Sequence, residues 1–323
     1  MNLKHFFSGV NKYKSAIDSL ALLVSINKYK LYLDCIWSFV RYGCVINHYI
    51  YGHFYQLRSY ERKKAFTFRI WKRIIHKAND QSVIHFLKNK VDFNCLYADF
   101  LGRDWLYSKE MTIVQFKDFV NKHKEAIIKP MDGMEGDGIS LCKFESDIES
   151  LFNTFKQKEL LIEERIIQHP EMVFGNSSVN TIRVYTIFNE RTGSVHLLKT
   201  VVRAGIGSSI VDNSHSGGCA YEIDKQKGYI ISSSYCANGL VTYIHPQTDI
   251  CMLGRKIPYW AEVLKLCDKA ARKLPKCRLI GWDVAITKDG PILIEGNHMP
   301  DLDMIEFVGT HGYKNEILSN LNL

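Results

Sequence analysis

The sequence of 323 residues contains no clean run of about 20 apolar residues, the length that a membrane-spanning helix requires. The nearest approach, residues 31–51, is interrupted by Asp34, Arg41, Gly43 and Asn47. The first ten residues lack an apolar core, and no small-residue cleavage pattern follows them. We therefore expect neither a spanning helix nor a secretory leader. We predict a cytoplasmic protein, with peripheral attachment to the inner face of a membrane as the alternative.

The nine cysteines include no close CxxC pair and no Cys/His spacing of the kind that binds zinc. We expect them to be reduced thiols, most of them buried. The glycine-rich stretch at residues 133–138 is followed by neither GK[ST] nor a predicted helix, so it is neither a P-loop nor a dinucleotide-binding fingerprint. Internal repeats and low-complexity linkers are absent as well.

The composition is that of an ordinary globular protein, with 46% hydrophobic and 24% charged residues. The net charge of +8, concentrated toward the N-terminus, would suit nucleic acid, an anionic membrane surface or acidic ligands such as nucleotides and uronic sugars. No basic and aromatic pattern matches a known nucleic-acid recognition geometry, so we predict no nucleic-acid partner.

Residues 1–80 are predicted to form a helical lobe rich in basic and aromatic side chains, and residues 81–323 a separate main domain. Two interpretations of the lobe stay open. Its helices lie on a membrane interface, with aromatic anchors and Lys or Arg on the polar side, or they pack on the main domain and leave a solvated basic face. The second outcome is the commoner one for such a segment.

The most informative stretch is residues 280–297, which alternate apolar and polar positions around Lys288-Asp289-Gly290 and so predict a β-hairpin. A three-residue loop would place Asp283 opposite Glu295, with Cβ atoms about 5 Å apart. Leu293, Glu295 and Asn297 would share one face. Two carboxylates so close repel unless a cation lies between them, and an oxygen-only set favours Mg²⁺. The alternative is a surface hairpin whose acids face water.

A glycine-rich hairpin is predicted between a strand at residues 126–129 and a second strand that begins at Ile139. Its three glycines can close over a phosphate without obstruction by side chains, and Lys129 beside them adds a cation. Lys90 by itself does not indicate a binding site, because most lysines are solvated. A strand at residues 160–164 is expected to be an edge strand whose exposed backbone could bind an adenine.

Three cations are predicted on one face of the next pair of strands. If the turn is centred on Arg191, Lys199 lies opposite Arg183, and Arg203 shares the face of Lys199. Like charges this close favour a bound anion such as a triphosphate, although side chains that point to water remain the alternative. The polar loop at residues 205–218 is either part of a ligand site or a flexible surface loop.

These parts occur in one order along the chain and together resemble the ATP-grasp superfamily, in its sugar-transfer-associated branch. The motifs that carry the resemblance are Ile128-Lys129-Pro130 with the three glycines, Ser178-Val179-Asn180-Thr181-Ile182-Arg183, Val211-Asp212-Asn213 with Gly217-Gly218, His245-Pro246, and Gly281-Trp282-Asp283-Val284 through Glu295-Gly296-Asn297. The resemblance implies an α+β ATP-grasp fold, with a small lid lobe at about 120–166 and a larger lobe at about 167–323 that grip ATP, preceded by the N-terminal helical lobe.

The resemblance also implies roles for individual residues. The phosphates of ATP would be held by Lys90 and Lys129 under a lid containing Gly133, Gly136 and Gly138. Adenine and ribose would be bound by Glu163, Glu164, Arg165, Ile166 and Glu171. Magnesium would be bound by Asp283, Glu295 and Asn297, and the transferred phosphoryl group by Arg183, Arg203 and Lys199. The second substrate would contact Asp212, Asn213 and His215.

The activity implied is an ATP- and Mg²⁺-dependent carboxylate–amine ligase that acts through an acylphosphate. It would join an amino acid or other amine to a sugar acid of a capsule, O-antigen or similar polysaccharide. Two alternatives stay open, namely a kinase of a glycan or lipid-linked sugar and a nucleotide-binding, non-catalytic partner of glycosyltransferases.

Overall fold

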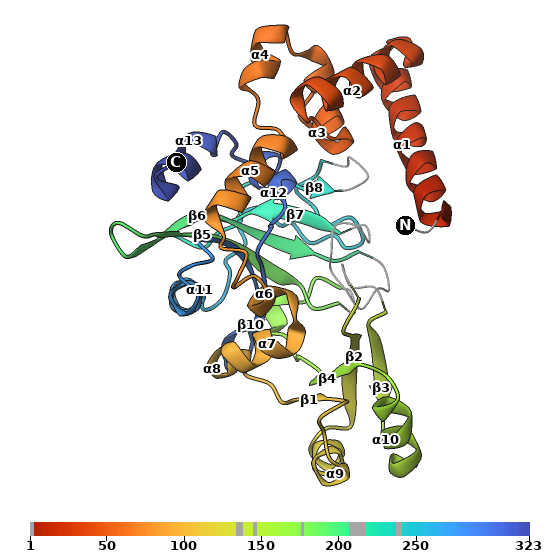
Figure 1. Ribbon diagram of the computed structural model, residues 1–323, viewed down its shortest axis with the longest axis vertical. Helices are drawn as coiled ribbons and strands as arrows, with labels where there is room; N and C mark the ends of the chain where they lie inside the picture. Colours follow the sequence, from red (N-terminus) through yellow and green to blue (C-terminus); the bar gives the residue numbers. More distant parts are fainter. Residues whose placement is uncertain (1–2, 134–137, 145–146, 176–177, 207–217, 237–240) are drawn as a thin grey trace.

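The computed structural model describes residues 3–133, 138–144, 147–175, 178–206, 218–236 and 241–323. Two antiparallel sheets organise the chain, and a group of N-terminal helices lies at the end of the molecule away from the smaller sheet (Figure 1). The predicted α+β class, with helices at the N-terminus, is confirmed.

The helices are named in chain order. The N-terminal ones are α1 (Leu3–Val24), α2 (Lys28–Tyr42), α3 (Ile46–Tyr51), η1 (Phe54–Gln56), α4 (Ser59–Lys64) and α5 (Phe68–Ala78). Those that follow are α6 (His85–Lys88), α7 (Lys90–Leu96), α8 (Ala98–Leu101), α9 (Ile113–Lys122), α10 (Ile148–Lys156), η2 (Pro170–Met172), α11 (Trp260–Lys273), α12 (Leu302–Glu306) and α13 (Lys314–Leu321).

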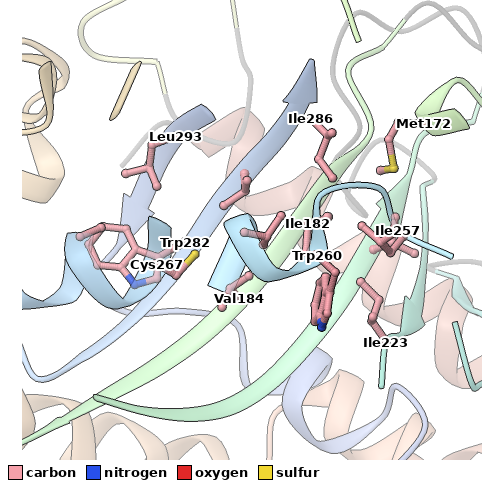
Figure 2. Packing of buried hydrophobic residues seen from close by; sticks show 14 of the residues in the cluster. Met172, Ile182, Val184, Ile223, Ile257, Trp260, Cys267, Trp282, Ile286 and Leu293 are labelled. Atoms are coloured by element: carbon pink, nitrogen blue, oxygen red, sulfur yellow. The ribbon is translucent and has the colours of Figure 1, made fainter. Parts of the chain in front are cut away.

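The larger sheet has six strands in the order β10-β9-β5-β6-β7-β8. Its strands are β5 (Thr181–Asn189), β6 (Ser194–Ala204), β7 (Cys219–Glu222), β8 (Tyr235–Cys236), β9 (Leu279–Thr287) and β10 (Gly290–Asn297). One face packs on α11 through Trp260 and Cys267, which meet Ile182, Val184 and other apolar side chains of the sheet (Figure 2). The opposite face is covered by α5, α12 and α13.

The hairpin of β9 and β10 brings Asp283 opposite Glu295, as predicted, but by a different route. Gly290 pairs with Thr287, so the loop has two residues rather than three, and the register shifts between Leu293 and Glu295. This β-bulge inserts one residue and restores the predicted pairing. It also turns Leu293 to the apolar face, so the prediction that Leu293 shares a face with Glu295 is wrong.

The pairing of β5 with β6 also differs from the prediction. Arg183 lies opposite Val201, and Lys199 lies opposite Tyr185. The turn is centred between Arg191 and Thr192 rather than on Arg191, and the register shifts by one more residue between Tyr185 and Thr186. The predicted pairing of Lys199 with Arg183 is therefore wrong by two residues along the strand. Because the displacement is an even number of residues, both side chains still lie on the same face of the sheet.

The smaller sheet has four strands in the order β1-β4-β2-β3. They are β1 (Trp105–Tyr107), β2 (Glu125–Pro130), β3 (Ser140–Lys143) and β4 (Leu160–Glu164). Because β1 and α9 belong to this layer, it begins earlier in the chain than the expected boundary near residue 120. β4 lies between β1 and β2, so the prediction of an edge strand at residues 160–164 is wrong.

The N-terminal helices have an apolar core of their own, formed by α1, α2, α3 and η1. α5 does not belong to it, because Trp71, Ile74 and Ile75 are buried against the large sheet instead. Asn47 and His48 of α3 bond the carboxylate of Asp303 at 2.9 Å each, which ties the helices to α12. Among the described residues, no helix combines the length and apolar character needed to cross a membrane.

Two cysteines are paired. Cys219 on β7 and Cys236 on β8 are cross-strand partners with Cα atoms 4.2 Å apart, and they form a disulfide. The expectation that all nine cysteines are reduced thiols is wrong for this pair, because sheet register brings together two residues that are 17 positions apart. The other seven are free, and three of these are buried.

Candidate functional site

A buried ionic group lies on the α5 and α12 side of the large sheet, centred on Asp283 of β9. Asp283 is the cross-strand partner of Arg183 on β5, and Arg183 donates two hydrogen bonds to its carboxylate, one of them from Nη2 at 2.9 Å. Arg203 adds a third from Nη1 at 2.9 Å. Burial works against the charged carboxylate, but the two arginines lower the pKa of Asp283 to about 2. Asp283 is therefore ionised at neutral pH.

Glu295 and Asn297 extend this group on β10. Glu295 is the cross-strand neighbour of Asp283, is accessible to solvent, and accepts a hydrogen bond from Asn297 Nδ2 at 3.1 Å. Partial desolvation by its surroundings, followed by the negative charge of Asp283, raises the pKa of the Glu295 carboxyl. Asp301, in the segment that follows β10, lies 3.4 Å from Arg183 Nη1. The structure thus brings together Arg183, Arg203 and the predicted magnesium ligands.

Lys199 is not part of this group. Its side chain is fully buried, and Nζ donates hydrogen bonds to the carbonyls of Ile305 at 2.8 Å and Thr310 at 2.5 Å, and to that of Val308. Burial lowers the pKa of Lys199 to about 8. The lysine binds backbone carbonyls at the end of α12 and directly after it, so the geometry assigns it to holding that segment rather than to a bound phosphate.

A second ionic group joins the two sheets. Glu163 of β4 is buried and accepts hydrogen bonds from Lys129 of β2 and from Arg103, whose Nη2 lies 2.7 Å from Oε1. Burial opposes ionisation, but Arg103 and Lys129 lower the pKa of Glu163 to about 2. The side chain of Glu163 therefore holds two cations in place.

Arg103 is a residue that sequence reasoning missed. It also donates to the carbonyls of Leu293 at 2.6 Å and Ile294 at 3.4 Å, at the bulge of β10. β10 is an edge strand, so these carbonyls need partners outside the sheet. Arg103 thus connects the small sheet to the strand that carries Glu295. The sequence does not indicate this role, because Arg103 is a single arginine in a Gly-Arg-Asp loop.

Lys90 lies at the junction of the small sheet and β10. Its Nζ donates to the backbone carbonyls of Pro130 at 2.9 Å, Met131 at 3.1 Å and Gly133 at 2.9 Å, where the glycine-rich hairpin leaves β2. Desolvation lowers its pKa, while Glu295 acts in the opposite direction. Lys90 therefore anchors the base of the predicted lid. Gly138 closes the hairpin with φ of +74°, in the left-handed region that favours glycine.

The predicted adenine-binding residues follow β4. Glu164 still pairs with β2, and its backbone N–H donates to Asp104 at 2.9 Å. Arg165 and Ile166 lie beyond the strand, where the described part of the chain gives their backbone N–H groups no partner. Glu171, in η2, has a solvent-exposed side chain. Gly136, Asp212, Asn213 and His215 lie outside the described residues.

One other set of potential metal ligands occurs among the described residues, namely Asp104, His123 and Glu164 on the small sheet. Asp104 already accepts a hydrogen bond from His123 Nε2 at 2.9 Å and lies 3.6 Å from Lys122 Nζ. The hydrogen bond from His123 and the nearby Lys122 ammonium lower the pKa of the Asp104 carboxyl, so the set forms an internal polar network.

Comparison with known proteins gives one family and a set of solved structures. The sequence profile of the sugar-transfer associated ATP-grasp family matches residues 148–322, just over half of the chain. A comparison with curated proteins finds no match.

Three solved structures illustrate the similarity. The ATP-grasp ligase PsnB complexed with minimal precursor, Mg and ADP is 14% identical, with a TM-score of 0.44, over 76% of this chain and 62% of that one. N5-carboxyaminoimidazole synthetase from Staphylococcus aureus complexed with ADP is 12% identical, with a TM-score of 0.43, over 70% and 48%. D-alanine-D-alanine ligase from Coxiella burnetii is 10% identical, with a TM-score of 0.41, over 73% and 56%. The chain thus spans less than two thirds of the length of each. The profile match over more than half of its residues shows that the chain belongs to the sugar-transfer associated ATP-grasp family.

Proposed function

We propose that this protein is an ATP- and Mg²⁺-dependent ligase that joins a carboxylate to an amine. The observation that carries the proposal is the ionic group of Arg183, Arg203, Asp283 and Glu295 on the large sheet, in a chain of the ATP-grasp family. Phosphoryl transfer requires mainly positioned positive charge and a metal. This site offers two guanidinium groups and carboxylate oxygens suited to a metal, and the reaction needs no covalent nucleophile from the protein.

The residues present fit a magnesium ion. A carboxylate oxygen has two lone pairs. Oδ2 of Asp283 uses both in its bonds to Arg183 and Arg203, whereas Oδ1 uses one, for Arg183. Asp283 can therefore offer one oxygen, beside the solvent-accessible carboxylate of Glu295 and the amide oxygen of Asn297. A cation here would also relieve the repulsion that raises the pKa of Glu295. Bound magnesium would neutralise charge on the β- and γ-phosphates of ATP.

In the proposed reaction, an oxygen of the substrate carboxylate attacks the γ-phosphorus of ATP, ADP leaves, and an acylphosphate forms. An amine then attacks the acyl carbon, inorganic phosphate leaves, and the amine loses a proton as the amide forms. Arg183 and Arg203 stabilise the charge of the transferred group, and Lys129 binds the phosphates from the side of the small sheet. The lid anchored by Lys90 excludes water from the acylphosphate. The backbone at Arg165 and Ile166, with Glu164 and Glu171 beside it, binds adenine and ribose.

The family description favours a sugar acid as the carboxylate substrate, with an amino acid or other amine as its partner, in the synthesis of a surface polysaccharide. We do not assign Lys199 a catalytic role. Asp212, Asn213 and His215 remain proposed contacts of the second substrate.

The first test is thermal unfolding of the purified chain with a non-hydrolysable ATP analogue. At a concentration of about 100 times the dissociation constant, the analogue should stabilise the protein by about 2.7 kcal/mol. We expect a rise in midpoint that requires Mg²⁺ and is lost in Glu295→Gln. The matched control Glu306→Gln, which changes an acid outside the site, should behave as the wild type. No rise in the wild type would overturn the proposed nucleotide site.

The second test identifies the reaction. Pairs of sugar acid and amine are incubated with ATP and Mg²⁺, and the products are weighed by mass spectrometry. A ligase joins both substrates with loss of water and releases ADP and phosphate. A kinase would add a phosphoryl group to one substrate and leave the other unchanged, which would replace the ligase proposal.

A further inference from the structure

The helix α2 exposes an apolar face to solvent. Its buried side is formed by Leu31 and Ser38, which face the core of the N-terminal helices. The opposite side carries large side chains at intervals of three or four residues, which places them on one helix face. They are Tyr29, Leu33, Ile36, Trp37 and Val40, exposed by 67%, 71%, 61%, 58% and 61%.

The apolar face, defined by these five residues, belongs to a well-anchored helix. Asn27 caps its first turn by accepting from the backbone N–H of Tyr29 at 2.9 Å, and Gly43 ends it in the left-handed conformation. Arg62 donates to both carboxylate oxygens of Asp34, at 2.6 and 2.9 Å, on the inner side. The rotation of α2 about its axis is therefore fixed. Leu22 and Leu23 of α1, each 83% exposed, add further apolar surface.

Basic residues flank this face. With 100° per residue, Lys30 and Arg41 lie along one border. Lys28 lies farther round the helix on the other side, beyond Phe39 and 4.0 Å from Asp18. Residues 1–80 contain 14 Lys and Arg against four Asp and Glu, whereas residues 81–323 contain 28 against 30. The basic surplus of the whole chain thus lies in the segment that carries the apolar face.

We propose that this face docks on an anionic phospholipid membrane. The aromatic and aliphatic side chains would enter the boundary between headgroups and acyl chains, and the flanking cations would meet the lipid phosphates. A second copy of the chain fits less well, because two such faces would bring their basic borders together. The single acid of α2, Asp34, is already paired with Arg62 and cannot offset that repulsion.

The apolar face of α2 lies apart from the proposed active site, but the N-terminal helices that carry it contact residues next to that site. It lies at the end of the molecule away from the small sheet (Figure 1). The same helices hold Asp303 through Asn47 and His48, and the adjacent Asp301 contacts Arg183. The inference does not depend on the proposed ligase activity, because binding to lipid is measured without ATP.

Flotation of the full chain with lipid vesicles tests the proposal. We expect the protein to float with vesicles of phosphatidylcholine and phosphatidylglycerol, to remain behind with phosphatidylcholine alone, and to dissociate as salt is raised. The double variant Leu33→Ser, Trp37→Ser should weaken binding at least about tenfold, since it removes two large apolar side chains. Its matched control is Val114→Ser, which changes an exposed residue on α9 (65% exposed) and should float as the wild type.

A variant that reverses two basic charges measures the electrostatic contribution to membrane binding separately from the apolar one. Lys30→Glu with Arg41→Glu should weaken binding by at least about fivefold for each cation removed. The control pair, Lys265→Glu with Lys269→Glu, changes exposed lysines on α11 and should have little effect.

Fluorescence quenching by brominated lipids locates the contact. Of the five tryptophans, Trp37 is exposed, Trp71, Trp260 and Trp282 are buried, and Trp105 is partly buried on the small sheet. Quenching should occur in the wild type and disappear in Trp37→Phe, which still floats.

Failure of the wild type to float, or flotation of the Leu33→Ser, Trp37→Ser variant at the wild-type level, would overturn the proposal. So would a wild-type dimer that this variant converts to monomer, because the face would then be a protein interface.

Discussion

Arg183 on β5 and Asp283 on β9 are cross-strand partners whose side chains form a buried ion pair with two hydrogen bonds. Arg203 binds the same carboxylate. Buried charges are tolerated when they are paired, so Asp283 keeps both guanidinium groups in position on the sheet. In the proposed reaction, phosphate oxygens compete with Asp283 for these two arginines.

Removal of the Asp283 charge should destabilise the fold. Asp283→Asn leaves Arg183 and Arg203 buried without their counter-charge, and we expect a loss of about 3–5 kcal/mol in the free energy of unfolding. Urea denaturation followed by circular dichroism measures it. Glu295→Gln, on the accessible neighbour, should cost less than about 1 kcal/mol. Equal losses in the two variants would contradict the central role of Asp283.

Acid should destabilise the protein in part through Glu163. The folded-state pKa of about 2 lies below the unfolded value of about 4.3, so the stabilisation is present above the unfolded pKa and is lost as the pH falls through the folded pKa. Between pH 5 and pH 2, Glu163→Gln should therefore lose less stability than the wild type. Glu164→Gln serves as the matched control, and a parallel loss in all three proteins would refute the assignment.

Lys199 should also make stability rise with pH, but in the alkaline range. Its folded-state pKa of about 8 lies below the unfolded value of about 10.4, so between these values the unfolded state binds more protons and stability rises with pH. The free energy of unfolding of the wild type, relative to Lys199→Met, should thus increase from pH 7 to pH 10. Denaturant titrations at several pH values measure this difference. A constant difference would show that the lysine titrates normally.

The cysteines should react in two classes. Alkylation of the denatured, unreduced protein should modify the seven free thiols, and prior reduction should make all nine reactive. Mass spectrometry counts the added groups. In Cys219→Ala, Cys236 loses its partner, so every remaining cysteine should react without reductant. Nine modified thiols in the unreduced wild type would rule out the disulfide.

Local sequence pattern was sufficient for the β9–β10 hairpin and for the glycine-rich hairpin between β2 and β3. The position of Asp283 opposite Glu295 was also predicted, but it depends on a β-bulge that the pattern did not show. The order of these motifs was also sufficient for the family, which the profile match confirms. Alternation with period two and turn residues are properties of neighbouring residues, so they can be recognised without a structure.

Tertiary structure decided the rest. The bulge that turns Leu293 inward, the placement of β4 between two strands, and the bonds from Lys199 to backbone near α12 all depend on residues far apart in the chain. Arg103 bonds Glu163 and the carbonyl of Leu293, 60 and 190 positions away. Such contacts follow from the packing of whole sheets, since a long side chain binds whichever partner the fold brings within reach. The residue types that could form a site were therefore readable from the sequence, whereas which of them meet was set by the fold.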